Sequence, residues 1–264
     1  MLERFRSAQL PGLEILKARE KAGLMPPPYP GVRPPFAACL RENGPGAIIA
    51  EYKRASPSAG SINLAAGPEE TAVAYAAAGA AALSVLTEEK HFQGRLEYLE
   101  RMAQAGLPLL RKDFLIHPLQ IAETASTPAS ALLLIVRLLE DGELIALLRA
   151  TIAAGLDAVL EIFSQAELQR ARSALAKAAA ATAVIQVNNR DLETLALDAS
   201  VSRRLIRYRQ AGEIWISASG ISRREDLDER RDLGFDAVLV GSLLMSGNDP
   251  GTALAFLSGR GGPA

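Results

Sequence analysis

The sequence is poor in the residues that build disulfides and most metal sites. Cys39 is the single cysteine among 264 residues, which excludes an internal disulfide and a zinc site made of several thiolates. His91 and His117 are the two histidines, they lack the spacing of metal ligands, and we expect both in loops or at the surface. The composition therefore favours a protein that holds no metal and works in a reducing compartment.

Strong net charge and long apolar runs are also lacking. The 29 basic and 30 acidic residues leave a formal net charge of -1, so an anion must be held by a local site rather than by a global field. The most apolar run, LLLIVRLLE, is interrupted by Arg137 and Glu140, and no segment reaches the roughly 18 apolar residues of a membrane span. The charged N-terminal segment does not resemble a signal peptide. We predict a soluble cytoplasmic protein with no nucleic-acid or membrane partner.

Aliphatic residues dominate what is present. Hydrophobic residues make up 49% of the chain and aromatic residues 5%, so the core must consist of Ala, Leu, Ile and Val, as buried parallel strands require. Short apolar runs alternate with helix-like stretches, which is typical of a parallel sheet with helical crossovers. The apolar runs are AIIAEYK from Ala47, AALSVLT from Ala81, LPLLRKD from Leu107, ALLLIV from Ala131, DAVLEIF from Asp157, AVIQVNN from Ala183, EIWISAS from Glu213 and DAVLVGS from Asp236.

The segment before the first apolar run has a different character. Residues 2–22 have the apolar spacing of a helix, through Leu10, Leu13, Ile15 and Leu16, and a proline-rich stretch, MPPPYPGVRPP, follows them. Too little chain precedes this stretch for it to link two domains. We expect one domain over residues 1–264, in which residues 1–46 form an N-terminal helical extension and connector.

Polar residues at the ends of the apolar runs distinguish an open sheet from a closed one. In an open sheet, functional residues gather at one switch point. Here they lie at the ends of the first, third, fifth, sixth, seventh and eighth runs, and they can converge only if the sheet closes. We predict an α/β fold of the (β/α)8 TIM barrel type. The residues concerned are Lys53, Lys112, Glu161, Asn188, Ser219, Gly241 and Ser242.

Two glycine-bearing turns predict a phosphate site. Gly241 and Ser242 end the last run, and Ser219 ends the seventh and is followed by Gly220. Bare amides and hydroxyls after these two strands form the usual phosphate site of such barrels. The alternative is that these glycines only permit tight turns, but their paired placement favours phosphate binding.

Charged residues at the strand ends predict acid–base chemistry. Glu51 and Lys53 are two residues apart and share one side of a strand, where a buried lysine and carboxylate must pair with each other or with a ligand. Lys112 and Glu161 end two further runs, and such groups have a tunable proton affinity. For any one of them a structural ion pair is the alternative. Their delivery from separate strands to one mouth favours catalysis.

Seven motifs, taken in their order along the chain, resemble the indole-3-glycerol phosphate synthase family of tryptophan biosynthesis. They are IIAEYKRASPSAG, LSVLTEEKHFQG, LLRKDF, LEIF, VNNRDLETL, SASGIS and VGSLLM. The resemblance extends from about residue 36 to residue 255. It implies a carboxy-lyase that closes the ring of 1-(2-carboxyphenylamino)-1-deoxyribulose 5-phosphate with loss of carbon dioxide and water. It further implies no metal or organic cofactor and a phosphorylated small molecule as the partner. We expect a monomer or weak homodimer.

The resemblance also implies roles for single residues. Lys112 is the general acid at the substrate carbonyl, and Glu161 moves protons in the later dehydration. Lys53 pairs with the anthranilate carboxylate and protonates the leaving hydroxyl, while Glu51 orients Lys53. The remaining residues bind substrate: Asn188 and Arg190 hold hydroxyls and carboxylates, Phe92 packs on the ring, and Ser56, Ser219, Gly220, Gly241 and Ser242 surround the phosphate.

One residue at the expected site departs from the family pattern. Most members have a glutamate where Ala218 stands, so Lys53 and Lys112 have one carboxylate fewer beside them. This departure leaves open a paralogue of altered substrate specificity or low activity. A non-catalytic subunit that binds a phosphate ligand is a further alternative, although such a subunit has no need of Lys112 and Glu161 together.

Overall fold

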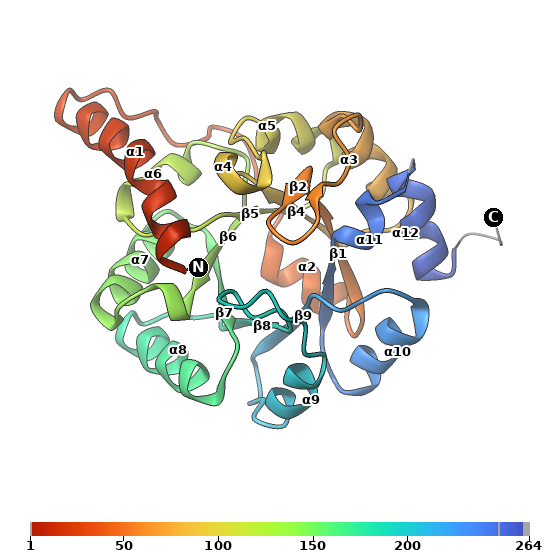
Figure 1. Ribbon diagram of the computed structural model, residues 1–264. Helices are drawn as coiled ribbons and strands as arrows, with labels where there is room; N and C mark the ends of the chain where they lie inside the picture. Colours follow the sequence, from red (N-terminus) through yellow and green to blue (C-terminus); the bar gives the residue numbers. More distant parts are fainter. Residues whose placement is uncertain (1, 248, 261–264) are drawn as a thin grey trace.

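The computed structural model describes residues 2–247 and 249–260. In this part of the chain, parallel strands form a closed barrel in the order β1-β10-β9-β8-β7-β6-β5-β4. Figure 1 looks close to along the barrel axis and shows the helices arranged outside the ring of strands. The predicted (β/α)8 barrel is confirmed.

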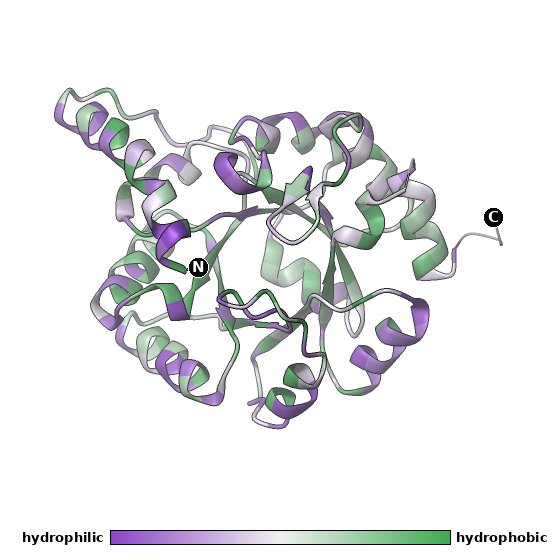
Figure 2. Cartoon of the chain, viewed as in Figure 1, coloured by the Kyte–Doolittle hydropathy of each residue, from purple (hydrophilic) through white to green (hydrophobic). Residues whose placement is uncertain are grey.

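Each predicted apolar run contains one barrel strand. The strands are buried along almost their whole length, because the barrel interior covers one face and the helices cover the other. In Figure 2 the strands are predominantly hydrophobic, whereas hydrophilic residues lie on the outer helices. The strands are β1 (Ala47–Tyr52), β4 (Ala82–Leu86), β5 (Leu109–Lys112), β6 (Ala131–Ile135), β7 (Asp157–Ile162), β8 (Val184–Asn188), β9 (Ile214–Ala218) and β10 (Ala237–Val240).

Some of the outer helices begin at a side-chain cap. The Ser164 hydroxyl accepts a hydrogen bond from the Glu167 amide at the start of α8, and the Asp249 carboxylate accepts one from the Thr252 amide at the start of α12. Of the described helices, none combines the length and the apolar character needed to cross a membrane. The helices are α3 (Pro68–Ala77), α4 (Glu89–Phe92), α5 (Tyr98–Met102), α6 (Pro118–Ala125), α7 (Asp141–Ala153), α8 (Gln165–Lys177), α9 (Ser200–Ile206), α10 (Arg224–Asp232), α11 (Ser242–Met245) and α12 (Pro250–Ser258), with 3-10 turns η1 (Ala103–Ala105) and η2 (Val136–Leu138).

The second helix of the N-terminal extension, α2 (Phe36–Asn43), covers the end of the barrel where the strands begin. The Ala37 amide donates to the Asp157 carboxylate at 2.9 Å, and the Cys39 thiol donates to the Ala81 carbonyl at 3.1 Å. Phe36 and Leu40 are fully buried. Through the barrel opening of Figure 1, α2 is visible behind the strands.

The first helix, α1 (Leu2–Lys21), lies at the opposite end, where the strands finish. Arg6 forms an ion pair with Glu143 on α7 and donates to the Leu138 carbonyl at 3.2 Å. The Gln9 amide donates to Asp113, just after β5, at 3.1 Å. The predicted helical extension therefore spans both ends of the barrel.

The buried face of α1 differs from the face that the sequence indicated. Leu13 and Leu16 are buried together with Phe5, whereas Leu10 and Ile15 are 48% and 56% exposed. The apolar residues of this helix are too scattered to define a single stripe, so tertiary contacts select which of them are covered.

A small hairpin after β1 was not predicted. It pairs β2 (Ala55–Ser56) with β3 (Gly60–Ser61) in antiparallel fashion. Strands of two residues are too short to show an alternating pattern. The hairpin brings Ser56 and the following turn to the mouth of the barrel.

Leu40→Ala tests how strongly α2 stabilises the barrel. Because the Leu40 side chain is fully buried, we expect the substitution to lower the free energy of unfolding by about 3 kcal/mol, as other buried leucines do. Chemical denaturation measures this change. Glu42→Ala, at an exposed position of the same helix, is the control and should change stability by less than about 0.5 kcal/mol. Equal effects of the two substitutions would contradict a packing role for α2.

Candidate active site

A cavity of about 490 Å³ opens at the end of the barrel where the strands finish. Its position agrees with the general location of active sites in such barrels. With the exception of Glu161, the predicted site residues all line it: Glu51, Lys53, Ser56, Phe92, Lys112, Asn188, Arg190, Ser219, Gly220, Gly241 and Ser242. Glu161 lines a small adjoining cavity, which shares Asn188, Arg190 and Leu192 with the main one.

Glu51 and Lys53 form an ion pair at the end of β1. The Lys53 ammonium lies 2.9 Å from Oε1 of Glu51 and also donates to the Ser242 hydroxyl at 3.0 Å. Lys53 thus connects the end of β1 to the turn after β10. Gly241 permits this arrangement, since a Cβ at that position would lie 2.2 Å from Oε1 of Glu51. The glycine therefore makes room for the carboxylate, which the sequence alone did not indicate.

The Glu51 carboxylate is held in its charged form. Burial by itself would raise its pKa, but the nearby ammonium groups of Lys53 and Lys112, together with the hydrogen bond from Lys53, lower the pKa below its ordinary value of 4.5. Two lysines from different strands therefore share the field of one buried carboxylate. The negative charge of Glu51 offsets part of the positive charge of the cavity.

Lys112 and Glu161 face each other across the barrel interior. The Lys112 ammonium lies 4.0 Å from Oε2 of Glu161. The same Oε2 accepts a hydrogen bond from the Gln186 side-chain amide at 2.6 Å. No described residue gives the Lys112 ammonium a closer anionic partner. Lys112 is therefore available to a ligand in the cavity.

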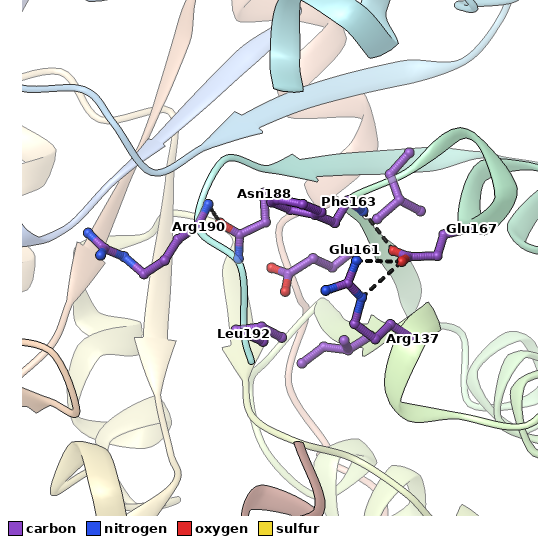
Figure 3. Close-up of a pocket in the computed structure, with 9 residues that line it drawn as sticks. Arg137, Glu161, Phe163, Glu167, Asn188, Arg190 and Leu192 are labelled. Atoms are coloured by element: carbon purple, nitrogen blue, oxygen red, sulfur yellow. Dashed lines mark hydrogen bonds and ion pairs between the residues drawn. The ribbon is translucent and has the colours of Figure 1, made fainter. Parts of the chain in front are cut away.

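Beside Glu161, a second set of charges ties three segments together (Figure 3). The Arg137 guanidinium forms ion pairs with Glu167 at 2.8 Å and with Asp191 at 2.9 Å, and it stacks over the Phe163 ring at 4.9 Å. These contacts join η2, α8 and the segment after β8. Figure 3 shows Glu161 between this cluster and Asn188, with Arg190 extending away from it. Arg137 was not predicted to be part of the site.

The turn after β9 is held by two asparagines. Ser219 has a left-handed φ of 67°, and Gly220 follows with a φ of 80°. Because Ser219 has a Cβ, this conformation costs it roughly 1 kcal/mol or more. The Asn188 side chain accepts a hydrogen bond from the Ser219 hydroxyl at 3.0 Å. The Asn189 amide donates to the carbonyls of Ala218 and Ser219, each at 3.1 Å. These bonds fix the turn that presents the Ser219 and Gly220 backbone to the cavity.

An aromatic cluster forms part of the cavity wall. Phe5 from α1 and Phe92 from α4 both line the cavity. Phe5 stacks on Phe114 with ring centroids 4.2 Å apart, and Phe92 lies 6.0 Å from Phe114. Neither Phe5 nor Phe114 was predicted. Aromatic residues make up only 5% of the sequence, and this rarity was the one signal that could have pointed to Phe5 and Phe114. Their convergence depends on the docking of α1, which the sequence does not indicate.

The structure corrects one local expectation. His91, expected at the surface or in a loop, belongs to α4, and its side chain is 3% exposed. It contacts Glu88 at 2.8 Å and the edge of Phe5, because α1 covers it. Within residues 2–247 and 249–260, no cluster of three or more His, Cys, Asp or Glu side chains suits a metal ion.

Ala218 lies at the end of β9 and lines the cavity, with 3% of its surface exposed. Its strand neighbours in register are Asn188 and Leu239. The departure from the family pattern is therefore located in the cavity wall itself.

Comparison with known sequences gives a consistent result. A family described as indole-3-glycerol phosphate synthase matches residues 31–257. Proteins of that name from Carboxydothermus hydrogenoformans and Opitutus terrae are 42% and 43% identical to this chain, over 83% and 86% of both partners. The protein of that name from Mycobacterium tuberculosis is 39% identical over 95% of this chain and 88% of its own length.

Solved structures of low sequence identity share the fold. A 3-hexulose-6-phosphate synthase has a TM-score of 0.62 at 13% identity, covering 81% of this chain and 98% of its own. A mutant tryptophan synthase α-subunit from Pyrococcus furiosus has a TM-score of 0.57 at 14% identity, with the same coverage. These similarities support the barrel architecture.

Lys53→Met tests the ion pair at the end of β1. A folded-state pKa below the ordinary value means that Glu51 stabilises the fold above pH 4.5 and loses this contribution as the pH falls through its lowered pKa. Without Lys53 the pKa of Glu51 rises, and the variant should lose about 3 kcal/mol at pH 7.

The loss of unfolding free energy in Lys53→Met should shrink by about half at pH 5, since Glu51 can then take up a proton in the variant. Denaturant unfolding at pH 7 and pH 5 measures this loss. Lys90→Met removes an exposed lysine and should be almost neutral at both. An equal loss at pH 7 and pH 5 for Lys53→Met would show that the pair has no electrostatic role.

Proposed function

The chain belongs to the indole-3-glycerol phosphate synthase family. On this premise we propose that it converts 1-(2-carboxyphenylamino)-1-deoxyribulose 5-phosphate to an indole by ring closure. The products are indole-3-glycerol phosphate, carbon dioxide and water. The observation that carries this proposal is the Lys112 ammonium, which faces a cavity with an aromatic wall, 4.0 Å from the Glu161 carboxylate. An ammonium and a carboxylate side by side at the mouth of the barrel can serve as the acid and the base of one reaction.

Ring closure requires an acid at the substrate carbonyl. As the aromatic carbon that bears the carboxylate attacks this carbonyl, negative charge develops on its oxygen, and Lys112 donates a proton to it. The new carbon–carbon bond then permits loss of carbon dioxide. The electron pair of the broken bond between the ring and the carboxylate restores the aromatic ring. A cation in a largely apolar cavity stabilises the developing charge more than it would in water.

Dehydration requires a base and an acid. Glu161 accepts the proton that the carbon next to the ring nitrogen loses as the carbon–carbon double bond of the new ring forms, while Lys53 protonates the hydroxyl, which leaves as water. Glu51, 2.9 Å from the Lys53 ammonium, orients Lys53 and balances its charge. Before this step, Lys53 also pairs with the anthranilate carboxylate.

Substrate binding divides between a polar side and an apolar side. Asn188 and Arg190 bind hydroxyl groups and the carboxylate. Phe92, together with Phe5, packs on the aromatic ring, and this apolar wall favours loss of a carboxylate by excluding water. The phosphate is bound by Ser56, Ser219, Gly220, Gly241 and Ser242, and the contact of Lys53 with Ser242 adds a positive charge to this end of the cavity.

We also propose that the protein works in the cytoplasm as a monomer or weak homodimer. The single cysteine supports a reducing compartment. The net charge of -1 supports a site that attracts anions only locally.

A fluorescence assay for indole-3-glycerol phosphate tests the function directly. The purified chain, incubated with the aminodeoxyribulose phosphate substrate, should form a fluorescent indole product without an added metal or cofactor. Absence of product from folded protein would refute the proposal.

Lys112→Met tests the general acid. Methionine fills a similar volume but cannot donate a proton, so we expect kcat to fall by at least about 1,000-fold while KM changes by less than about tenfold. Lys177→Met, at an exposed position on α8, should retain full activity. Substantial turnover by Lys112→Met would assign the acid to another residue.

A further inference from the structure

Gln186 is a buried polar residue beneath the cavity. It lies on β8 two residues before Asn188, so the two side chains share the interior side of the barrel. Its exposed fraction is 0%. Barrel interiors are normally filled by branched apolar side chains. The presence of an amide at this depth therefore requires a partner or a function.

The partner is the carboxylate of Glu161. Strand pairing sets Gln186 directly opposite Glu161, and Nε2 of the amide donates to Oε2 of the carboxylate at 2.6 Å. A hydrogen bond to a charged acceptor is short and strong, so it fixes the rotation of the carboxylate. Lys112 lies 4.0 Å from the same oxygen. Gln186 thereby holds Glu161 in its orientation toward the proposed general acid.

The other end of the amide is unsatisfied. Oε1 of Gln186 is buried and accepts no hydrogen bond from the described residues. The residue in register on its other side, Ile216, is apolar. An unpaired buried acceptor costs about 1–3 kcal/mol, and most such atoms in folded proteins are paired. A methionine would fill the same space without this cost.

An amide can bind a carboxyl group in both of its protonation states. Nε2 donates to a carboxylate, and after a half-turn about the last side-chain torsion Oε1 accepts from a carboxylic acid. Because Oε1 has no partner in the observed orientation, this turn breaks only the bond to Glu161. We propose that Gln186 is a positioning residue that holds Glu161 in one place while Glu161 gains and loses a proton. This inference rests on the proposed function, which gives Glu161 that role.

The charged surroundings of Glu161 leave this task to Gln186. Arg137 is already engaged by Glu167 and Asp191, and Lys112 is assigned to the substrate. The charged groups around the two cavities are Lys112 on β5, Arg137 on η2, Glu167 on α8, Arg190 and Asp191 after β8, and Glu51 and Lys53 at the end of β1.

Gln186→Met and Gln186→Glu test the proposal by steady-state kinetics over pH. Methionine keeps the length of the side chain but removes both polar atoms, so kcat should fall by about 10- to 100-fold at every pH while KM changes by less than about threefold. In Gln186→Glu the two carboxyl groups bond only while they share a proton. We expect this variant to be at least about fivefold more active than Gln186→Met near pH 5.5, and to lose that advantage by about pH 8.

Ser130→Ala is the matched control. Ser130 is another buried residue whose side-chain oxygen has no described partner, but it precedes β6 at the opposite end of the barrel. This variant should keep the wild-type kcat and pH profile. Thermal melting establishes that each variant is folded, and if Gln186→Met does not fold, the pH dependence of Gln186→Glu decides alone.

Turnover by the wild type distinguishes failure of the proposed function from failure of the positioning role of Gln186. A folded wild-type chain that forms no indole-3-glycerol phosphate refutes the proposed function. An active wild type, with an unchanged kcat in Gln186→Met or a pH profile of Gln186→Glu that matches the wild type, refutes the positioning role of Gln186 alone.

Discussion

Closure of one parallel sheet is the constraint on which the rest of this protein depends. β1 pairs with β10 on one side and with β4 on the other, so the barrel leaves no open edge, and all strands finish at the same end. Residues more than a hundred positions apart, such as Lys53 and Ser242, are brought within 3.0 Å in this way. The strands themselves are aliphatic and carry little chemistry. The site exists because their last residues are polar and meet at one mouth.

Pairing of charges at that mouth is the second constraint. A lone ammonium or carboxylate in the barrel interior would be strongly unfavourable. Glu51 lies in the field of two lysines, which lowers its pKa, and Glu161 is held by Gln186 opposite Lys112. Close approach is needed for such pairing, and Gly241 provides the space that a Cβ would occupy. The same contacts that make the charges tolerable also fix their orientation at the cavity.

The N-terminal extension links the two ends of the barrel. α2 covers the end where the strands begin, through Phe36 and Leu40. α1 lies at the other end and contributes Phe5 to the cavity. Part of the apolar cavity wall therefore comes from a helix outside the repeating strand–helix pattern.

Local patterns were enough to predict the strands, their alternation with helices and the residues at the mouth, because hydrophobic periodicity is a local property. The sequence indicated Lys112, Glu161 and the phosphate turns, since their position after a strand places them at the rim of any closed parallel sheet. The position of Phe5 at the cavity, the burial of the His91 side chain and the hydrogen bond from Gln186 to Glu161 appear only in the folded chain. These contacts join residues whose distance in space depends on strand register and helix docking, and no local pattern encodes either.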